Sequence, residues 1–208
     1  TEVGSKVLLH LSPGTKESTD CCRDFLQDML RRGLAQPVLV VTDGAAGLIR
    51  AVEECLPLAL RQRCLAHKIR NISNKLPDAI RAEFQQAARS AYQAPNQAMA
   101  QTLREGICNQ YANVCPTALR CFEEDFDACI AHLKCPPGHR RVIRTTNLLE
   151  RLFLEERRRM RAAPRMIGER AVLKLMFAAM IRAAERWKGL RISEFEHRQL
   201  AALRQQIK

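Results

Sequence analysis

Hydrophobic and polar positions divide the chain into a mixed first part and a helical second part. The aliphatic run at 38–41 leads into Thr42, Asp43 and Gly44, which is typical of a buried strand that ends in a carboxylate. Elsewhere in the first part, short apolar runs typical of strands alternate along the chain with segments whose apolar residues recur at helical spacing. The pattern predicts strands at 7–11, 38–43 and 59–64, and helices that end near residues 32 and 54.

The second part of the chain reads as helical almost throughout. The alternation of strands and helices before it favours parallel pairing in an α/β domain. From 77 to about 134, apolar residues recur at helical spacing, and further helices are predicted from Asn147, from 169 to 187 and from Ser193. We therefore expect a helix-rich α/β protein in three parts, at 1–75, 76–140 and 141–208.

Composition indicates a folded, reduced protein. Of the 208 residues, 47% are hydrophobic and 27% are charged, which is typical of a globular chain. No apolar run is long enough to cross a bilayer, and nothing in the sequence indicates export. We expect a cytoplasmic protein that does not bind membranes, and reduced thiols in its nine cysteines.

Positive charge is concentrated near the middle of the second part. The net charge is +12, and residues 140–174 hold eleven Lys/Arg against four Asp/Glu. A solvated basic face is the simple interpretation of such a run. A polyanionic partner such as nucleic acid is the alternative that the size of the excess favours.

The segment from Thr145 to Arg159 combines this charge with a carboxylate. Glu150 and Arg157 lie seven residues apart, so in a helix they share a face on which a metal ion and a phosphate could bind. Asn147 followed three residues later by Glu150 is also a capping-box pattern, and in that interpretation Glu150 is structural.

Two motifs before this segment bear on the choice. Asp43 ends a predicted buried strand, although it could instead cap the helix that follows. Cys64 and His67 have half the ligands of a zinc site, or are buried structural residues.

The three motifs and their order resemble the Mutator-type transposases of bacterial insertion sequences. That family has an aspartate in a strand-TD-AxxGL segment, then C-x2-H, then a TN-x-x-E-R-L-x-x-E helix, and the likeness covers essentially the whole chain. It implies the C-terminal part of a catalytic domain with a ribonuclease H-like core, truncated at its N-terminus to a few strands, and an all-helical insertion.

The resemblance also implies the chemistry of a DDE-type DNA transposase. Asp43 and Glu150 would bind Mg²⁺, with Mn²⁺ as a possible substitute, and Cys64 and His67 would support the site. The DNA ends of an insertion sequence would be the partner, bound by several copies of the protein, with no small-molecule substrate. The implied phosphate contacts are Arg144, Arg151, Arg157, Arg158 and Arg159. Glu155 and Glu156 are alternatives for the glutamate.

The family's first aspartate has no counterpart here, because Asp20, Asp24 and Asp28 lie on a predicted helix. We therefore expect this chain by itself not to transpose DNA. A non-enzymatic DNA-binding or dimerising remnant of a transposase is the alternative function.

One further cluster has the residue types of a zinc site. Cysteine and histidine alternate at tight spacing in Cys129, His132, Cys135 and His139. Cys129 lies on the apolar stripe of its predicted helix, where a free cysteine packs as a small hydrophobe. A zinc-stabilised helical interaction module would depend on this cluster.

Overall fold

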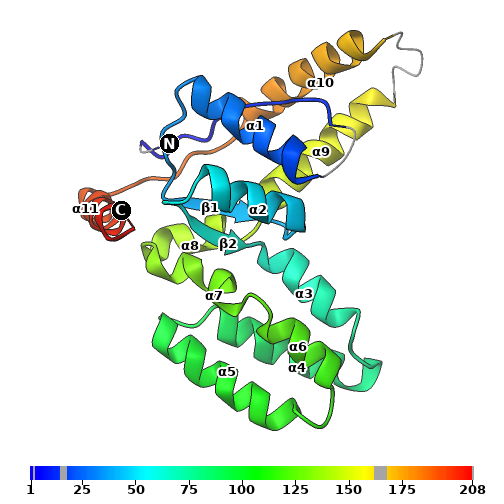
Figure 1. Cartoon of the computed structure of the whole chain (residues 1–208), viewed down its shortest axis with the longest axis vertical. Coiled ribbons are helices and arrows are strands. Elements are labelled where there is room, and N and C mark those ends of the chain that lie inside the picture. Colours follow the sequence, from blue (N-terminus) through cyan, green and yellow to red (C-terminus); the bar gives the residue numbers. More distant parts are fainter. Residues whose placement is uncertain (2, 15–17, 162–167, 208) are drawn as a thin grey trace. The chain divides into compact units, whose positions relative to one another are not determined.

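The computed structural model describes residues 1, 3–14, 18–161 and 168–207, and only the backbone of residues 159, 160 and 169. The elements in chain order (Figure 1) are α1 Thr19–Arg31, β1 Leu39–Thr42, α2 Ala46–Cys55, β2 Leu60–Arg63, α3 Leu65–Ser73, α4 Asp78–Tyr92, α5 Gln97–Tyr111, α6 Pro116–Glu123, α7 Phe126–Cys129, the 3-10 helix η1 Ala131–Lys134, α8 Pro137–Ile143, α9 Asn147–Met160, α10 Glu169–Ala184 and α11 Glu194–Gln206. Among the described residues, no helix has both the length and the apolar composition needed to cross a bilayer.

These elements form two compact units. The first unit contains Thr1–Ala35, Ala46–Cys55 and Asn147–Arg198. The second unit contains Gln36–Ala45, Leu56–Thr146 and Gln199–Lys208. The three-part division expected from the sequence stays a prediction.

In the first unit, α1 packs on α2 and α9 packs on α10. Leu26 and Met29 of α1 and Ala51 and Val52 of α2 are buried. Helix α1 ends where predicted, since Gly33 follows it with φ +95°, a conformation that glycine adopts without steric cost.

The strand predicted at 7–11 is wrong. These residues have no regular secondary structure, and Val7 and Leu9 are exposed. The His10 ring instead stacks on Phe25 of α1, with the ring centroids 4.5 Å apart. A short apolar run forms a strand only where a partner strand completes its hydrogen bonds, and this run packs along a helix.

The other two predicted strands are confirmed, and they form a parallel pair in the second unit. Leu39 pairs with Leu60 and Thr42 with Arg63, so both strands end at the same edge. Among the described residues the sheet has these two strands and no others. The chain is thus a helix-rich α/β protein with one small parallel sheet, and the ribonuclease H-like core stays a prediction.

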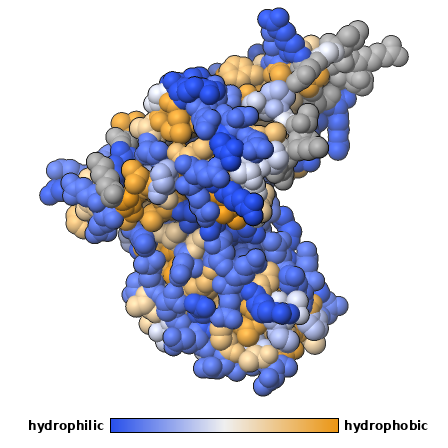
Figure 2. Space-filling model, in the orientation of Figure 1, coloured by the Kyte–Doolittle hydropathy of each residue, from blue (hydrophilic) through white to orange (hydrophobic). Residues whose placement is uncertain are grey.

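The helices predicted between 77 and 134 are confirmed, and together with α3 they form the main hydrophobic core of the second unit (turquoise to green in Figure 1). Four aromatic side chains pack edge to face or tilted at its centre: Phe84, Tyr92, Phe122 and Phe126. Figure 2 shows hydrophilic residues over most of the visible surface of this helical cluster, with scattered hydrophobic ones between them.

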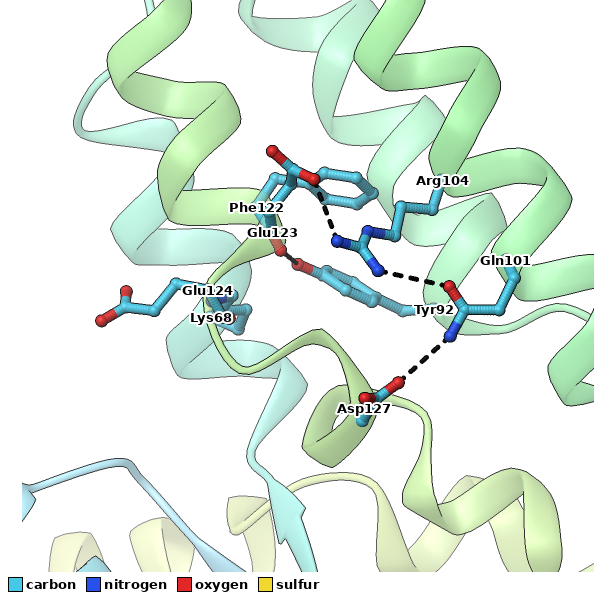
Figure 3. Close-up of polar contacts among 8 residues, drawn as sticks. All are labelled: Lys68, Tyr92, Gln101, Arg104, Phe122, Glu123, Glu124 and Asp127. Carbon is cyan, nitrogen blue, oxygen red and sulfur yellow. Dashed lines mark hydrogen bonds and ion pairs between the residues drawn. The ribbon is translucent and has the colours of Figure 1, made fainter.

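Two buried polar side chains inside the cluster are bonded to the backbone (Figure 3). The Tyr92 hydroxyl donates to the Phe122 carbonyl oxygen at 2.8 Å, and the buried Lys68 ammonium donates to the Glu124 carbonyl oxygen. Both bonds fall where α6 ends, next to Asp125 with its positive φ of 60°. They satisfy carbonyls that the helix end would otherwise leave without partners.

A buried glutamine joins β2 to the helices that follow α6. Gln62 is fully buried, and its amide nitrogen donates to the Cys129 carbonyl oxygen at 3.0 Å. Its amide oxygen accepts the backbone N–H of His132 at 2.7 Å and lies 3.1 Å from Nδ1 of the same residue. Because an amide oxygen can only accept, the neutral His132 ring carries its proton on Nδ1.

The buried His132 makes stability depend on pH. Burial lowers the pKa of His132 to about 4, and the positive charges of Arg144 and Arg140 act in the same direction. The folded protein therefore holds His132 neutral at a pH where the unfolded chain, with an ordinary histidine pKa of about 6.5, already binds a proton. This contribution to stability is complete above about pH 6.5 and is lost as the pH falls toward about 4.

We predict that His132→Gln flattens this dependence. Between about pH 7 and about pH 4, the free energy of unfolding of the wild type should fall by on the order of 3 kcal/mol more than that of the variant. Urea unfolding at several pH values measures both. Equal losses in the two proteins would contradict the buried neutral histidine. Acidic residues also titrate in this range, but they do so in both proteins and cancel in the difference.

Candidate active site

Asp43 lies where β1 ends, in the second unit. Its carboxylate is half-buried, and Oδ1 accepts the backbone N–H of Ala45 at 3.1 Å. This bond closes a turn two residues long before α2 begins at Ala46. The carboxylate is thus held by its own turn.

Gly44 is the residue that permits this turn. Its φ is +97°, and the guanidinium of Arg63 occupies the space that a Cβ would fill. Arg63 is the last residue of β2 and pairs in register with Thr42 of β1. The parallel register therefore brings a guanidinium against the backbone immediately after Asp43.

Cys64 follows β2 as Asp43 follows β1. Its backbone N–H donates to the Thr42 carbonyl oxygen at 2.7 Å, which continues the ladder beyond the strands. The Cys64 side chain is fully buried, and its Sγ lies 3.3 Å from Nδ1 of His67 in the first turn of α3. The structure therefore brings Cys64 and His67 together, next to the residue that precedes Asp43.

The same sulfur contacts a distant segment of the second unit. Thr146 directs both its backbone N–H, at 3.3 Å, and its hydroxyl, at 3.2 Å, toward Cys64 Sγ. Close by, the Leu65 N–H donates to the Arg144 carbonyl oxygen at 2.9 Å. The segment that leads into α9 is thereby attached to the start of α3.

Glu150 lies in the first turn of α9, in the first unit, and is partly exposed. Of the two alternatives on this helix, Glu155 forms an ion pair with Arg158 at 3.3 Å, and Glu156 is buried, with 7% of its surface exposed. Asp43 and Glu150 belong to different units, so their meeting at one metal ion stays a prediction.

The arginines expected to contact phosphate differ in their surroundings. Arg151, Arg157 and Arg158 are exposed on α9, although Arg157 Nε donates to the Phe153 carbonyl oxygen of its own helix at 3.3 Å. Arg144 is half-buried, and burial lowers its pKa. The side chain of Arg159 lies outside the described residues.

The four possible zinc ligands near the end of the helical cluster do not converge on one point; they are Cys129, His132, Cys135 and His139. All four are described, and no three of their ligand atoms lie within 4.8 Å of one another. Cys129 is fully buried, and burial raises the pKa of its thiol to about 12. His132 is committed to Gln62.

Comparison with known proteins identifies the family. The family described as "Transposase, Mutator family" matches residues 1–189. The chain belongs to this family of transposases. The matched residues include Asp43 after β1, Cys64 after β2 and Glu150 in α9.

Relatives in the Mutator family are named as transposases of insertion sequences. The transposase for insertion sequence element IST2 of Acidithiobacillus ferrooxidans is 32% identical over 191 residues, which are 91% of this chain and 64% of that protein. The IS6120 transposase of Mycolicibacterium smegmatis is 30% identical, covering 90% of this chain and 58% of that protein. The ISRM5 transposase of Rhizobium meliloti is 28% identical, covering 97% and 52%. The chain thus spans between half and two thirds of the length of these relatives.

Two residues near the site were missed by sequence reasoning. Thr146 was visible only as part of the segment before the predicted helix, and Arg63 only as the residue before Cys64. A threonine directly before a helix is a signal for local hydrogen bonding, but it does not identify a sulfur 82 residues away as the partner.

Gly44 gives a direct test of the turn beside Asp43. We predict that Gly44→Ala destabilises the chain by about 1–3 kcal/mol, because alanine is strained at positive φ and the Arg63 side chain has to move. Urea unfolding measures the effect.

Gly106→Ala is the matched control in the same unit. Gly106 lies inside α5 with open space around it, so alanine there should stabilise by about 0.5–1 kcal/mol. Effects of the same sign at the two positions would contradict the proposed geometry of the turn.

Proposed function

We propose that this chain supplies two metal-binding carboxylates, Asp43 and Glu150, and part of the DNA-binding surface of a DNA transposase of the DDE type. The observation that carries the proposal is the position of Asp43. It follows the end of a parallel strand, where the bond from the Ala45 N–H holds its carboxylate. Membership of the Mutator family supports the reaction class.

The donor atoms fit a hard divalent cation. Carboxylate oxygens are the ligands that Mg²⁺ prefers, and Mn²⁺ accepts the same set. The Ala45 N–H that binds Asp43 Oδ1 fixes the direction of the carboxylate without using both of its oxygens. Cys64 and His67 carry softer donors that suit other metals, so we assign them to support of the site.

Each group has a defined part in the reaction. A divalent ion at such a site polarises the phosphodiester and stabilises charge on the attacking and leaving oxygens. Asp43 presents its carboxylate from a strand end whose position is fixed by the ladder bond from Cys64 to Thr42. Glu150 presents its carboxylate from the first turn of α9. The proposal includes a ribonuclease H-like core to which β1 and β2 belong.

The DNA partner is proposed from charge. The exposed arginines of α9 can bind phosphate oxygens, which gives affinity without reading the base sequence. By the likeness to insertion-sequence transposases, the DNA would be the ends of such an element, held by more than one copy of the protein. A role in binding DNA without chemistry is the competing function.

Metal binding separates the two functions. We predict that the wild-type chain binds Mn²⁺, followed by the loss of its free electron paramagnetic resonance signal, and that Asp43→Asn or Glu150→Gln each weakens this binding by at least about tenfold. The double variant should bind Mn²⁺ only slightly more weakly than either single variant, because both carboxylates bind the same ion.

Glu155→Gln is the control, since it removes a carboxylate from the same helix that is already paired with Arg158. If Glu150→Gln binds Mn²⁺ as well as Glu155→Gln does, Glu150 is not a ligand and the non-catalytic function is favoured.

A further inference from the structure

Cys64 forms hydrogen bonds to two different segments, one through its backbone N–H and one through its sulfur. Its backbone N–H holds the Thr42 carbonyl oxygen, one residue before Asp43. Its sulfur accepts hydrogen bonds from the N–H and the hydroxyl of Thr146, one residue before α9 begins. One residue thus contacts the segments that lead into both of the proposed metal ligands.

The surroundings of the sulfur make these bonds effective. The Cys64 side chain is fully buried, so water does not compete for the Thr146 donors. The adjacent bond from Leu65 to the Arg144 carbonyl oxygen holds the same segment at a second point. Two neighbouring attachments restrict rotation of the segment more than one attachment would.

A buried cysteine is usually only a small hydrophobe, and Cys115 shows that case in the same unit. Both cysteines are buried and stand at the N-cap of a helix, Cys64 before α3 and Cys115 before α6, and neither caps its helix with a side-chain bond. Cys64 differs by the two Thr146 donors directed at its sulfur.

We propose that Cys64 is a positioning residue, whose sulfur anchors Thr146, the residue before α9, beside the start of α3. Glu150 lies four residues after Thr146, about one helical turn along α9. The position of the Glu150 carboxylate therefore depends on where the helix begins. The catalytic consequence rests on the proposed function, whereas the anchor itself does not.

Hydrogen exchange tests the anchor directly. In Cys64→Ala, the backbone amides of Thr146, which loses its buried acceptor, and of Glu150, whose helical bond runs back to the Thr146 carbonyl, should exchange about fivefold faster or more than in the wild type. Cys64→Ser keeps an acceptor and should restore part of the protection. Thr146→Val removes only the hydroxyl donor and should give a smaller increase of the same kind. Cys115→Ala, the matched control, should leave these amides unchanged.

Exchange at Thr146 and Glu150 that is the same in Cys64→Ala as in Cys115→Ala would overturn the inference. If Cys64→Ala fails to fold, Thr146→Val decides, and unchanged exchange in that variant has the same meaning.

Mn²⁺ binding tests the positioning role separately. Half-saturation in Cys64→Ala should require about fivefold more Mn²⁺, with partial recovery in Cys64→Ser and no change in Cys115→Ala. Unchanged Mn²⁺ binding in Cys64→Ala, in a protein where Asp43→Asn weakens it, would overturn the positioning role. Absence of Mn²⁺ binding by the wild type would instead overturn the proposed function, and exchange would still decide whether the anchor exists.

Discussion

The parallel pairing of β1 and β2 is the constraint on which the candidate site depends. Because the strands run in the same direction and in register, Arg63 at the end of β2 and Asp43, Gly44 and Cys64 just after the strand ends lie at one edge of the sheet. Two strands alone are marginal, so the pair needs support from other elements. Gln62 supplies part of it, because its buried amide bonds β2 to residues that lie about 70 positions later in the chain. The position of the Asp43 carboxylate thus depends on the folding of the helical cluster.

The positively charged residues fall into two groups, those bonded to other groups of the protein and those exposed to solvent. In the second unit, Arg61 forms an ion pair with Asp125, Lys68 donates to a carbonyl, and Arg140 donates to the carbonyl oxygens of Leu133, Cys135 and Pro95. These cations hold turns in place and are already occupied. Arg151, Arg157 and Arg158 of α9 are exposed, and they form the surface proposed to bind DNA. Net charge therefore overstates the surface available to a polyanion.

The sequence predicts most of the local structure and little of what depends on distant partners. The run at 38–41 and Gly33 were sufficient for β1 and for the end of α1, because burial and positive φ are local requirements. The run at 7–11 has equal apolar character but packs along α1, a tertiary outcome that its pattern does not contain. Helix α8 was not predicted: it begins at Pro137, and proline interrupts most helices although it is compatible with a first helical turn. For the candidate site, the motifs gave Asp43, Cys64 and His67, but the contact between Cys64 and Thr146 joins residues 82 positions apart and could come only from the fold.

The central claim is that Asp43 and Glu150, which lie 107 residues apart in the chain, bind one metal ion. Iron-directed cleavage tests it most directly, because Fe²⁺ bound in place of Mg²⁺ produces hydroxyl radicals that cut only the backbone near the ion. The claim predicts two cuts in the folded chain, one near residue 43 and one near residue 150, both lost in Asp43→Asn and both lost in Glu150→Gln. A cut near residue 43 that persists in Glu150→Gln, or cleavage near only one of the two positions, would contradict it.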